Sequence, residues 1–344
     1  MPIPTAFPDA RTPDPTSAPP LRWAVLAPGG IAHRFAKAVA TMPAQSLVAV
    51  GSRSGERAEK FAAEYGIDRS YGSYAELVAD PDVQAVYIAS PHSEHRDHAL
   101  LALGAGKHVL VEKAFTRNAA EARAVADAAR SAGLVAVEAM WTRFLPHIDV
   151  VRQLLAEGAL GPVQTVMADH GQRFEPDPHH RMFAPELAGG ALLDLGVYPI
   201  SFASFVLGHP DRITATGTLT DTGVDAQVST VFSHGEAQAV VNTTLTGRTP
   251  ITASITGTQG RLELDGSFYG PTVMRLIAND GTVLTRERDD IDSPAGFTFQ
   301  IGHVATLAAE GATESPLMPL DESIDILSSI DAIRAQLGVR YPGE

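Results

Sequence analysis

The stretch Leu21-Arg-Trp-Ala-Val-Leu-Ala-Pro-Gly-Gly-Ile-Ala-His-Arg-Phe-Ala-Lys-Ala-Val-Ala40 is the most informative part of this chain. Residues 21–27 form an apolar run of strand length, and residues 31–40 place apolar side chains at helical spacing. A turn of Pro28, Gly29 and Gly30 lies between them. Strand, glycine turn and helix in this order predict a dinucleotide site, because glycines let the backbone approach a pyrophosphate whose charge the helix N-terminus favours.

The match to the dinucleotide-binding pattern G-x-G-x-x-G/A is incomplete. Gly29 and Ala32 fit the pattern, whereas its first position holds Ala27. A plain turn between a strand and a helix is therefore the alternative. If the turn binds a cofactor, the expected contacts come from Pro28, Gly29, Gly30 and Ile31.

A second apolar run, residues 47–50, ends at Gly51-Ser52-Arg53-Ser54. A chain that binds NAD usually places Asp or Glu here to bond the ribose hydroxyls. A carboxylate would repel a 2′-phosphate, whereas Arg53, helped by Ser52 and Arg57, would pair with one. The sequence therefore predicts NADP rather than NAD as the cofactor, and a solvated basic turn is the alternative.

A third apolar run, residues 109–111, ends in the charged pair Glu112-Lys113. Ligands bind at the carboxyl ends of the strands in a doubly wound parallel sheet. We therefore expect Lys113 to point at a bound cofactor or substrate. The alternative is a surface ion pair that follows a strand.

Five segments together resemble the Gfo/Idh/MocA oxidoreductase family, and within it the dihydrodiol dehydrogenase and NADP-dependent D-xylose dehydrogenase branch. They are Ala27-Pro-Gly-Gly-Ile-Ala32, Ser90-Pro-His-Ser-Glu-His95, Glu112-Lys-Ala114, Met140-Trp-Thr-Arg-Phe-Leu-Pro146 and Gly189-Gly-Ala-Leu-Leu-Asp-Leu-Gly-Val-Tyr-Pro199. The usual Glu-Lys-Pro of the family is here Glu-Lys-Ala. Ala114 thus replaces a proline that would stiffen the backbone, while Lys113 is retained.

The resemblance implies hydride transfer between a nicotinamide and a carbinol carbon of a sugar, polyol or diol, with Lys113, Asp194 and Tyr198 in the active site. Tyr198 is the expected general acid/base, because a nearby ammonium would lower its pKa. Lys113 is the alternative proton carrier, and Asp194 would orient the lysine or a substrate hydroxyl. Packing of a half-buried tyrosine is the alternative role for Tyr198.

The resemblance also assigns contacts to the loops. Ser90, His92 and His95 are expected to contact the cofactor, and Glu112 the nicotinamide ribose. A second group follows the last strand of the nucleotide-binding domain, where it would wall a substrate pocket or pack between domains: Trp141, Arg143 and Phe144.

Asp194 and Tyr198 are four residues apart, so on a helix they share one face. Pro199 complicates this arrangement, because a residue before proline is pushed out of the helical region. We therefore expect a helix that is kinked here or that begins near Pro199.

The order of elements predicts an α/β protein with two domains. Strand-like and helix-like segments alternate to about residue 138, as in a doubly wound parallel sheet; from residue 163 onward strands are separated by turns, which suits an open, mostly antiparallel sheet. The expected divisions are a proline-rich, disordered tail over residues 1–20, a Rossmann domain over 21–139 and an α+β substrate domain over 140–344. In the resembling family the second sheet commonly forms a dimer interface, so a homodimer or higher homo-oligomer is expected.

Composition excludes several other classes of protein. The formal net charge of −14 would repel a nucleic-acid backbone, and no apolar run approaches the roughly 18 residues of a membrane span. The absence of cysteine excludes disulfides and thiol catalysis and fits a reducing compartment, so a cytoplasmic enzyme is expected. No metal is expected, although His92, His95 and His98 are spaced by three. His92 and His95 lie in a loop where the resembling family contacts its cofactor, and His179 and His180 lack a nearby carboxylate at convincing ligand spacing.

Two alternative functions stay open from the sequence. The family includes a galactose-pathway transcriptional co-repressor, so this fold also serves as a nucleotide-binding sensor. Joint retention of Lys113, Asp194 and Tyr198 favours an enzyme. Among enzymes, a ketosugar reductase of the 1,5-anhydrofructose type would share the cofactor and most of the site.

Overall fold

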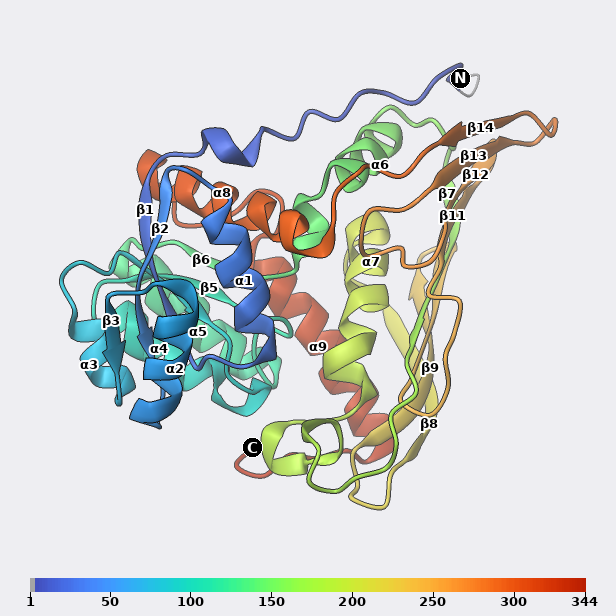
Figure 1. The fold of residues 1–344 in the computed structure, drawn as a ribbon. Coiled ribbons are helices and arrows are strands. Elements are labelled where there is room, and N and C mark those ends of the chain that lie inside the picture. Colours follow the sequence, from blue (N-terminus) through green and yellow to red (C-terminus); the bar gives the residue numbers. More distant parts are fainter. Residues whose placement is uncertain (1–3) are drawn as a thin grey trace. The chain divides into compact units, whose positions relative to one another are not determined.

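The computed structural model describes residues 4–344, which fall into two compact units (Figure 1). The first, called the Rossmann unit below, comprises Pro13–Phe144 and Asp292–Ile324. The second, called the sheet unit, comprises the described residues up to Thr12, together with Leu145–Ile291 and Asp325–Glu344. This division differs from the expected one, which placed every residue from 140 onward in the second domain.

Helix α8 (Ser293–Glu310) explains that difference, because it packs against α1 (Gly30–Ala40) within the Rossmann unit. At Gly302 of α8, an added Cβ would lie 3.2 Å from Pro15 Cα and 3.3 Å from Ala18 Cβ. The lack of a side chain thus lets the segment before the first strand approach the helix. Contacts between residues so distant in sequence leave no local pattern to read.

A six-stranded parallel sheet forms the centre of the Rossmann unit, in the order β3-β2-β1-β4-β5-β6. This is the strand order of the doubly wound dinucleotide-binding fold, and it confirms the predicted α/β class. Strand β4 is buried along its whole length, which explains why such strands are continuous apolar runs. The strands are β1 Leu21–Leu26, β2 Gln45–Gly51, β3 Arg69–Tyr71, β4 Ala85–Ile88, β5 His108–Val111 and β6 Ala136–Glu138. The other helices are α2 Gly55–Tyr65, α3 Tyr74–Ala79, α4 His95–Gly104 and α5 Ala119–Ala132.

Capping residues mark the start of α5 and the ends of α2 and α5. The side chain of Asn118 accepts the N–H of Glu121 at 2.9 Å at the start of α5. Gly66 and Gly133 adopt left-handed backbone angles directly after α2 and α5. Glycine takes that conformation without steric cost, so both helices end at these positions.

The segment before β1 was expected to be a disordered tail, and its described part is instead held by defined contacts. The side chain of Asp14 caps a 3₁₀ turn, Pro15–Ser17, by accepting the N–H of Thr16 at 2.9 Å. The carbonyl of Pro19 accepts the Gln45 amide at 2.7 Å. Prolines restrict the backbone in advance, so few contacts suffice to order it. Residues 1–3 of the expected tail lie outside the described residues.

An eight-stranded sheet forms the sheet unit, in the order β14-β13-β12-β11-β7-β10-β9-β8. All neighbouring strands run antiparallel except β7 and β10, which are parallel, so the sheet is mostly antiparallel as predicted. The strands are β7 Val163–Gly171, β8 Arg212–Leu219, β9 Asp225–His234, β10 Ala237–Thr244, β11 Ala253–Gly257, β12 Gly260–Leu264, β13 Met274–Ala278 and β14 Val283–Arg286. The helices are α6 Pro146–Ala156, α7 Val197–Leu207 and the part of α9 (Leu320–Leu337) from Asp325 onward.

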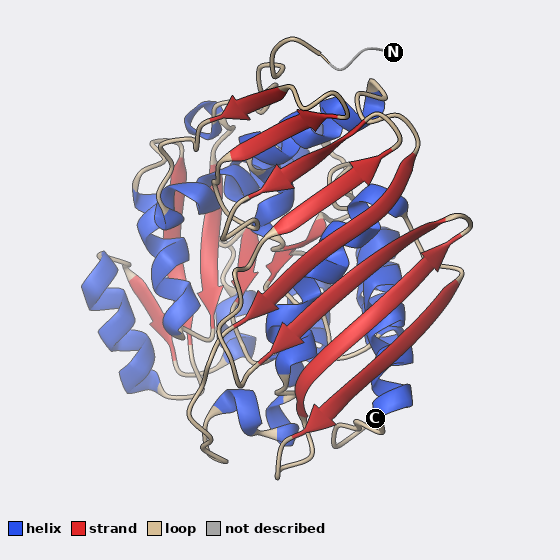
Figure 2. Ribbon diagram, turned by 90° about the vertical axis from the view of Figure 1, so that its right-hand side faces the viewer, coloured by secondary structure: helices blue, strands red, loops and turns tan. Residues whose placement is uncertain are grey.

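One face of this sheet packs against helices and the other is open, as Figure 2 shows. Burial alternates along β9, with Val228 and Phe232 buried and Val231 exposed. Met167 of β7 is 54% exposed on the same open face as Val231. An uncovered sheet face that carries apolar side chains is a surface suited to a partner.

Among the described residues, one helical segment is long and apolar enough to cross a membrane, Pro185–Leu207. Within its most apolar window, 72% of the segment is buried inside the protein. A helix that is apolar on all sides is expected when other elements cover it, so burial in the sheet unit accounts for its composition.

Candidate active site

The glycine turn before α1 is shaped to receive an anion. Gly29 is the N-cap residue of α1, and no side chain caps the helix there. An added Cβ at Gly30 would meet no protein atom within 4 Å, and the first turn carries no acidic residue. The first N–H groups of a helix lack partners within the helix, so this terminus fits a pyrophosphate. Of the expected contact residues, Pro28 and Gly29 lie in this turn, and Gly30 and Ile31 begin α1.

Ala27, the mismatch to the glycine pattern, has a φ of 64°. This is the left-handed conformation that the fingerprint glycine would adopt at no steric cost. Its N–H donates to the carbonyl of Gly51 at 3.0 Å, and its carbonyl accepts the N–H of Gly29 at 2.8 Å. The turn thus keeps the geometry of the pattern although the residue differs.

Two cationic side chains follow β2, one in the loop after the strand and one in the first turn of α2. Arg53 and Arg57 are exposed, whereas Ser52 is buried and its hydroxyl accepts the N–H of Ser54 at 3.2 Å. The guanidinium of Arg53 also acts on Tyr74 at the start of α3, where burial raises the pKa of the phenol and Arg53 opposes that rise. Two exposed guanidinium groups fit the 2′-phosphate of NADP, because Arg binds phosphate through several N–H donors.

Side chains from neighbouring strand ends hold the backbone around Lys113. The carbonyl of Lys113 lies 3.3 Å from His92 Nε2, and the carbonyl of Ala114 lies 2.9 Å from His95 Nδ1. His95 also lies 2.8 Å from the carbonyl of Ser90, so one imidazole bridges two loops. Burial lowers the pKa of His95. The Lys113–Ala114 peptide bond is cis.

Two buried carboxylates complete this support. Glu138, at the end of β6, accepts the N–H of Phe115 at 3.0 Å and the hydroxyl of Ser323 at 2.7 Å. Burial raises the pKa of Glu138 to about 7. Glu112 accepts the Tyr87 hydroxyl and the N–H of Lys113. Both contacts of the Glu112 carboxylate lie inside the Rossmann unit, and one of them is with the backbone of Lys113. Contact between Glu112 and the nicotinamide ribose stays a prediction.

The three residues expected at the substrate pocket pack within the Rossmann unit. Arg143 is buried, and its guanidinium donates two hydrogen bonds to the carboxylate of Glu322. The bond from Nη1 to Oε2 is 3.2 Å long. Trp141 lies against Phe297 of α8 with ring centroids 5.5 Å apart, and Phe144 is buried beside α8 as well. These contacts give all three a packing role, and their contact with a substrate stays a prediction.

In the sheet unit, Asp194 lies in a π turn, Leu192–Gly196, that leads directly into α7. Pro199 lies in the first turn of α7, where it lacks an N–H and its ring would clash with the carbonyl four residues earlier in a regular helix. A wider turn removes that clash, so the segment is a distorted continuous helix rather than a clean start at Pro199. The N–H of Leu192 donates to the buried Asp225 at 2.6 Å, and burial raises the pKa of Asp225 to about 7.

Asp194 forms an ion pair with Arg181 that the sequence does not reveal. Arg181 Nη1 lies 3.1 Å from Asp194 Oδ1, and Nη2 lies 3.2 Å from Oδ2. The two residues are 13 positions apart in an irregular loop, so no helical or strand spacing relates them. Only the fold of the loop brings this cation to the expected active-site carboxylate.

Tyr198 lies in an aromatic cluster with two residues that sequence reasoning also missed. The ring of Tyr198 is 5.3 Å from His170 of β7 and 4.6 Å from Tyr269, measured between centroids. His170 and Tyr269 stack at 4.8 Å. Neither residue carries a local signal that connects it with Tyr198.

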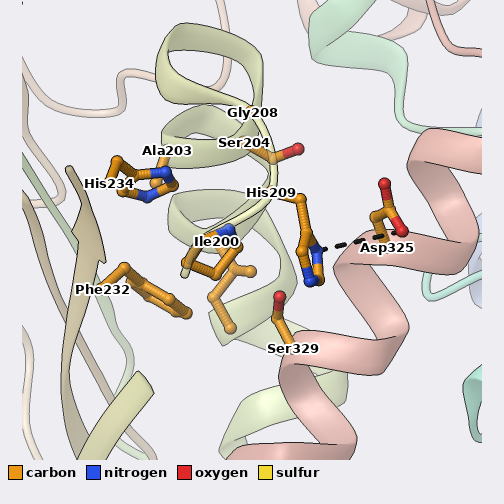
Figure 3. Close-up of a pocket in the computed structure, with 10 residues that line it drawn as sticks. Ile200, Ala203, Ser204, Gly208, His209, Phe232, His234, Asp325 and Ser329 are labelled. Carbon is orange, nitrogen blue, oxygen red and sulfur yellow. Dashed lines mark ion pairs between the residues drawn. The ribbon is translucent and has the colours of Figure 1, made fainter. Parts of the chain in front are cut away.

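A small hollow on the sheet unit lies on the other side of α7 (Figure 3). Ile200 and Ser204 of α7 line it, and they lie on the face of the helix opposite Tyr198, since each residue advances about 100°. His209 pairs with Asp325 there at 3.9 Å. No cluster of three or more metal-ligating side chains occurs among residues 4–344, so this pair is described as an ion pair only.

Comparison with known proteins places this site in a family. Residues 21–139 match the model "Oxidoreductase family, NAD-binding Rossmann fold", and residues 148–263 match "GFO/IDH/MocA C-terminal domain". Human trans-1,2-dihydrobenzene-1,2-diol dehydrogenase is 36% identical over 330 residues, which cover 94% of this chain and 98% of that protein. The chain belongs to the Gfo/Idh/MocA oxidoreductase family. It is an NAD(P)-dependent dehydrogenase, as the sequence predicts.

Solved structures of the Gfo/Idh/MocA family share both halves of the fold. Aldose-aldose oxidoreductase from Caulobacter crescentus, complexed with glycerol, superposes with a TM-score of 0.84 at 27% identity and covers 93% of this chain and 98% of its own. A 3-ketoreductase from Actinomadura kijaniata, in complex with NADP and TDP-benzene, superposes with a TM-score of 0.80 at 27% identity and covers 92% and 97%.

Proposed function

We propose that this chain is an NADP-dependent dehydrogenase that acts on a carbinol carbon of a sugar or a cyclic diol. The observation that carries the proposal is the support of Lys113: four side chains contact the backbone of residues 113–115 at the carboxyl edge of the parallel sheet. An ion pair on the surface does not need its backbone held by buried side chains. A side chain that acts on a reacting group does, because a small displacement of that side chain lowers the reaction rate strongly.

The division of labour follows from the chemistry of alcohol oxidation. Bound nicotinamide would supply the hydride acceptor at C4. The uncapped start of α1 would hold the pyrophosphate, and Tyr198 would take the hydroxyl proton as the carbinol hydride leaves. Tyr198 must be a phenolate before it can accept this proton, and the Lys113 ammonium would stabilise that phenolate. Since Lys113 and Tyr198 belong to different units, the proposal requires that both act on one bound substrate.

Selection of NADP over NAD is part of the proposal. Arg53, just after β2, and Arg57, in the first turn of α2, are exposed, and residues 51–54 supply no carboxylate. The 3-ketoreductase from Actinomadura kijaniata holds NADP in its crystal structure, which shows that the fold accepts this cofactor in one relative. The two arginines support the same choice here.

The substrate class rests on the aromatic cluster of His170, Tyr198 and Tyr269 in the sheet unit. Ring faces suit the C–H face of a pyranose or a cyclic diol. The similar proteins are named for trans-1,2-dihydrobenzene-1,2-diol and for aldoses, both of which present vicinal oxygens. We therefore propose a sugar or cyclic vicinal diol.

The open face of the sheet supports assembly into a homodimer. Met167 and Val231 are exposed there, and Val240, which pairs with both of them across β10, lies between them. A second copy would cover this face symmetrically. A cytoplasmic location is proposed as well, in keeping with the absence of cysteine.

A substrate screen tests the function. Aldoses, inositols, glycosides and trans-dihydrodiols are each incubated with NADP or NAD, and ketosugars with the reduced cofactors, while the absorbance of the reduced nicotinamide is followed. We expect turnover of at least one sugar or cyclic diol with NADP. Turnover confined to ketosugar reduction would assign a 1,5-anhydrofructose-type reductase instead, and no turnover with any substrate class would contradict the proposal.

A further inference from the structure

Arg181, which pairs with Asp194, is fixed in place by the residues that follow it. It begins a 3₁₀ turn, Arg181–Phe183, whose Met182 and Phe183 are buried. They belong to one hydrophobic cluster with Ala191, Leu195 and Leu245. Leu195 lies in the π turn beside Asp194, so one apolar cluster anchors both the loop that carries Arg181 and the turn that carries Asp194.

The glycine pair before the π turn allows this approach. An added Cβ at Gly189 would lie 2.6 Å from the carbonyl oxygen of Arg181 and 2.8 Å from that of Met182. Real Cβ atoms are not found so close to backbone oxygen. The N–H of Gly190 also donates to the carbonyl of Met182 at 2.9 Å. Backbone therefore packs directly on backbone, and this contact brings the Arg181 side chain to Asp194.

The two side chains differ in their access to solvent. The Asp194 side chain is 10% exposed and both of its oxygens accept from Arg181, whereas the Arg181 side chain is 54% exposed. A guanidinium carries five N–H donors, and Asp194 takes two of them in the described contacts. Donors remain on the exposed side of Arg181, next to the carboxylate that the proposed reaction uses.

We propose that Arg181 is a specificity-determining residue, which donates to an oxygen of the substrate adjacent to the reacting carbinol. This inference rests on the proposed function and narrows it to vicinal diols and polyols. A mono-alcohol of the same ring size leaves the donors of Arg181 without an acceptor. The bound substrate would cover the exposed side of Arg181 and exclude water from it. An analogue that lacks the adjacent oxygen would then leave the guanidinium donors unpaired, so the site would reject it.

Two substitutions and a matched control test this role. Arg181→Gln removes the cation, Arg181→Lys keeps the charge without the fork of donors, and Arg173→Gln removes another cation of the same loop that is 63% exposed and pairs with Glu175 at 2.9 Å. Each variant is assayed with a vicinal diol that the unmodified enzyme oxidises and with its mono-deoxy analogue. Unfolding in urea confirms that each variant is folded.

We expect Arg181→Gln to lower kcat/KM for the diol by about 10- to 100-fold, mainly through KM, and to abolish the preference for the diol over the deoxy analogue. Arg181→Lys should recover part of both, and Arg173→Gln should behave as the unmodified enzyme. A fall in kcat alone, with the preference intact, would overturn the inference, since Arg181 would then act only through Asp194. Unchanged kinetics in Arg181→Gln would overturn it too. If the unmodified enzyme oxidised no diol or sugar at all, that result would instead contradict the proposed function, and this inference with it.

Discussion

The carboxylate of Glu138 accepts the backbone N–H of Phe115, two residues after Lys113, at 3.0 Å. Glu138 is fully buried, and its second oxygen accepts the Ser323 hydroxyl at 2.7 Å. Burial raises its pKa from an ordinary value of 4.5 to about 7. The folded protein therefore binds this proton more tightly than the unfolded chain does, so the stability of the fold around Lys113 depends on pH.

We predict that Glu138→Gln flattens the dependence of stability on pH. Proton binding at Glu138 contributes to the free energy of unfolding. This contribution is fully present below pH 4.5 and is lost as pH rises through about 7. Between these pH values the free energy of unfolding of the unmodified protein should therefore fall, relative to that of the variant, by at most about 3 kcal/mol. Urea unfolding at pH 5, 6, 7 and 8 measures this. Asp225→Asn is the matched case in the other unit, because burial raises the pKa of Asp225 to about 7 as well. Parallel pH profiles for the unmodified protein and Glu138→Gln would contradict the shift at Glu138.

The proton-transfer pair is tested by single and double substitution. We expect Lys113→Met and Tyr198→Phe each to lower kcat by about 10²- to 10⁴-fold, the range of a positioned acid or base. The double variant should lose much less than the product of the two, because groups that act as a unit are non-additive. Tyr269→Phe removes a hydroxyl from the same aromatic cluster and should keep kcat within about tenfold. Near-normal turnover by Tyr198→Phe would leave Lys113 as the proton carrier.

Cofactor choice is tested at the end of β2. We expect kcat/KM to favour NADP over NAD by at least about tenfold, equivalent to about 1.4 kcal/mol, and Arg53→Asp to erase or reverse this preference. Arg123→Asp, an exposed site on α5, makes the same change of charge away from the nucleotide edge and should leave the preference intact. Equal use of NAD by the unmodified enzyme would make Arg53 a solvated turn residue.

Ala27 offers a test of backbone conformation. Its φ of 64° costs an L-residue about 1–2 kcal/mol, part of which glycine returns through its greater freedom in the unfolded chain. Ala27→Gly should therefore stabilise the protein by about 0.5–1 kcal/mol, whereas Ala27→Val should destabilise it. The midpoints of urea unfolding measure both effects. A less stable glycine variant would show that residue 27 is not strained.

Gly30→Ala should separate folding from cofactor binding. The added Cβ meets no protein atom within 4 Å, and alanine favours a helix by about 1 kcal/mol, so stability should hold or rise. The same methyl group would occupy the space in front of the α1 terminus, so KM for NADP should rise by about tenfold or more, a cost of about 1.4 kcal/mol. An unchanged KM for NADP would place the pyrophosphate elsewhere.

Local patterns in the sequence sufficed for the parallel sheet of the Rossmann unit and for the mostly antiparallel character of the second sheet. The glycine turn, the apolar run before Lys113 and the alternation along β9 all depend on neighbouring residues, and each carries its own signal. Arg181, His170 and Tyr269 carry none, because their roles arise from contacts with residues 13 to 71 positions away. The position of α8 beside α1 escaped prediction for the same reason.

The π turn at Leu192–Gly196 sets the relative orientation of the chain before and after it. A π turn contains about one residue more than an α-helical turn, so deleting a residue there would restore a regular helix. Asp194 and Tyr198 would then be three positions apart, a spacing that still places both on one side of an α-helix. The ring of Pro199, however, would meet the carbonyl four residues earlier, so the shortened segment would kink or break there. The extra residue of the π turn is thus what lets a proline follow Tyr198 directly without breaking the helix.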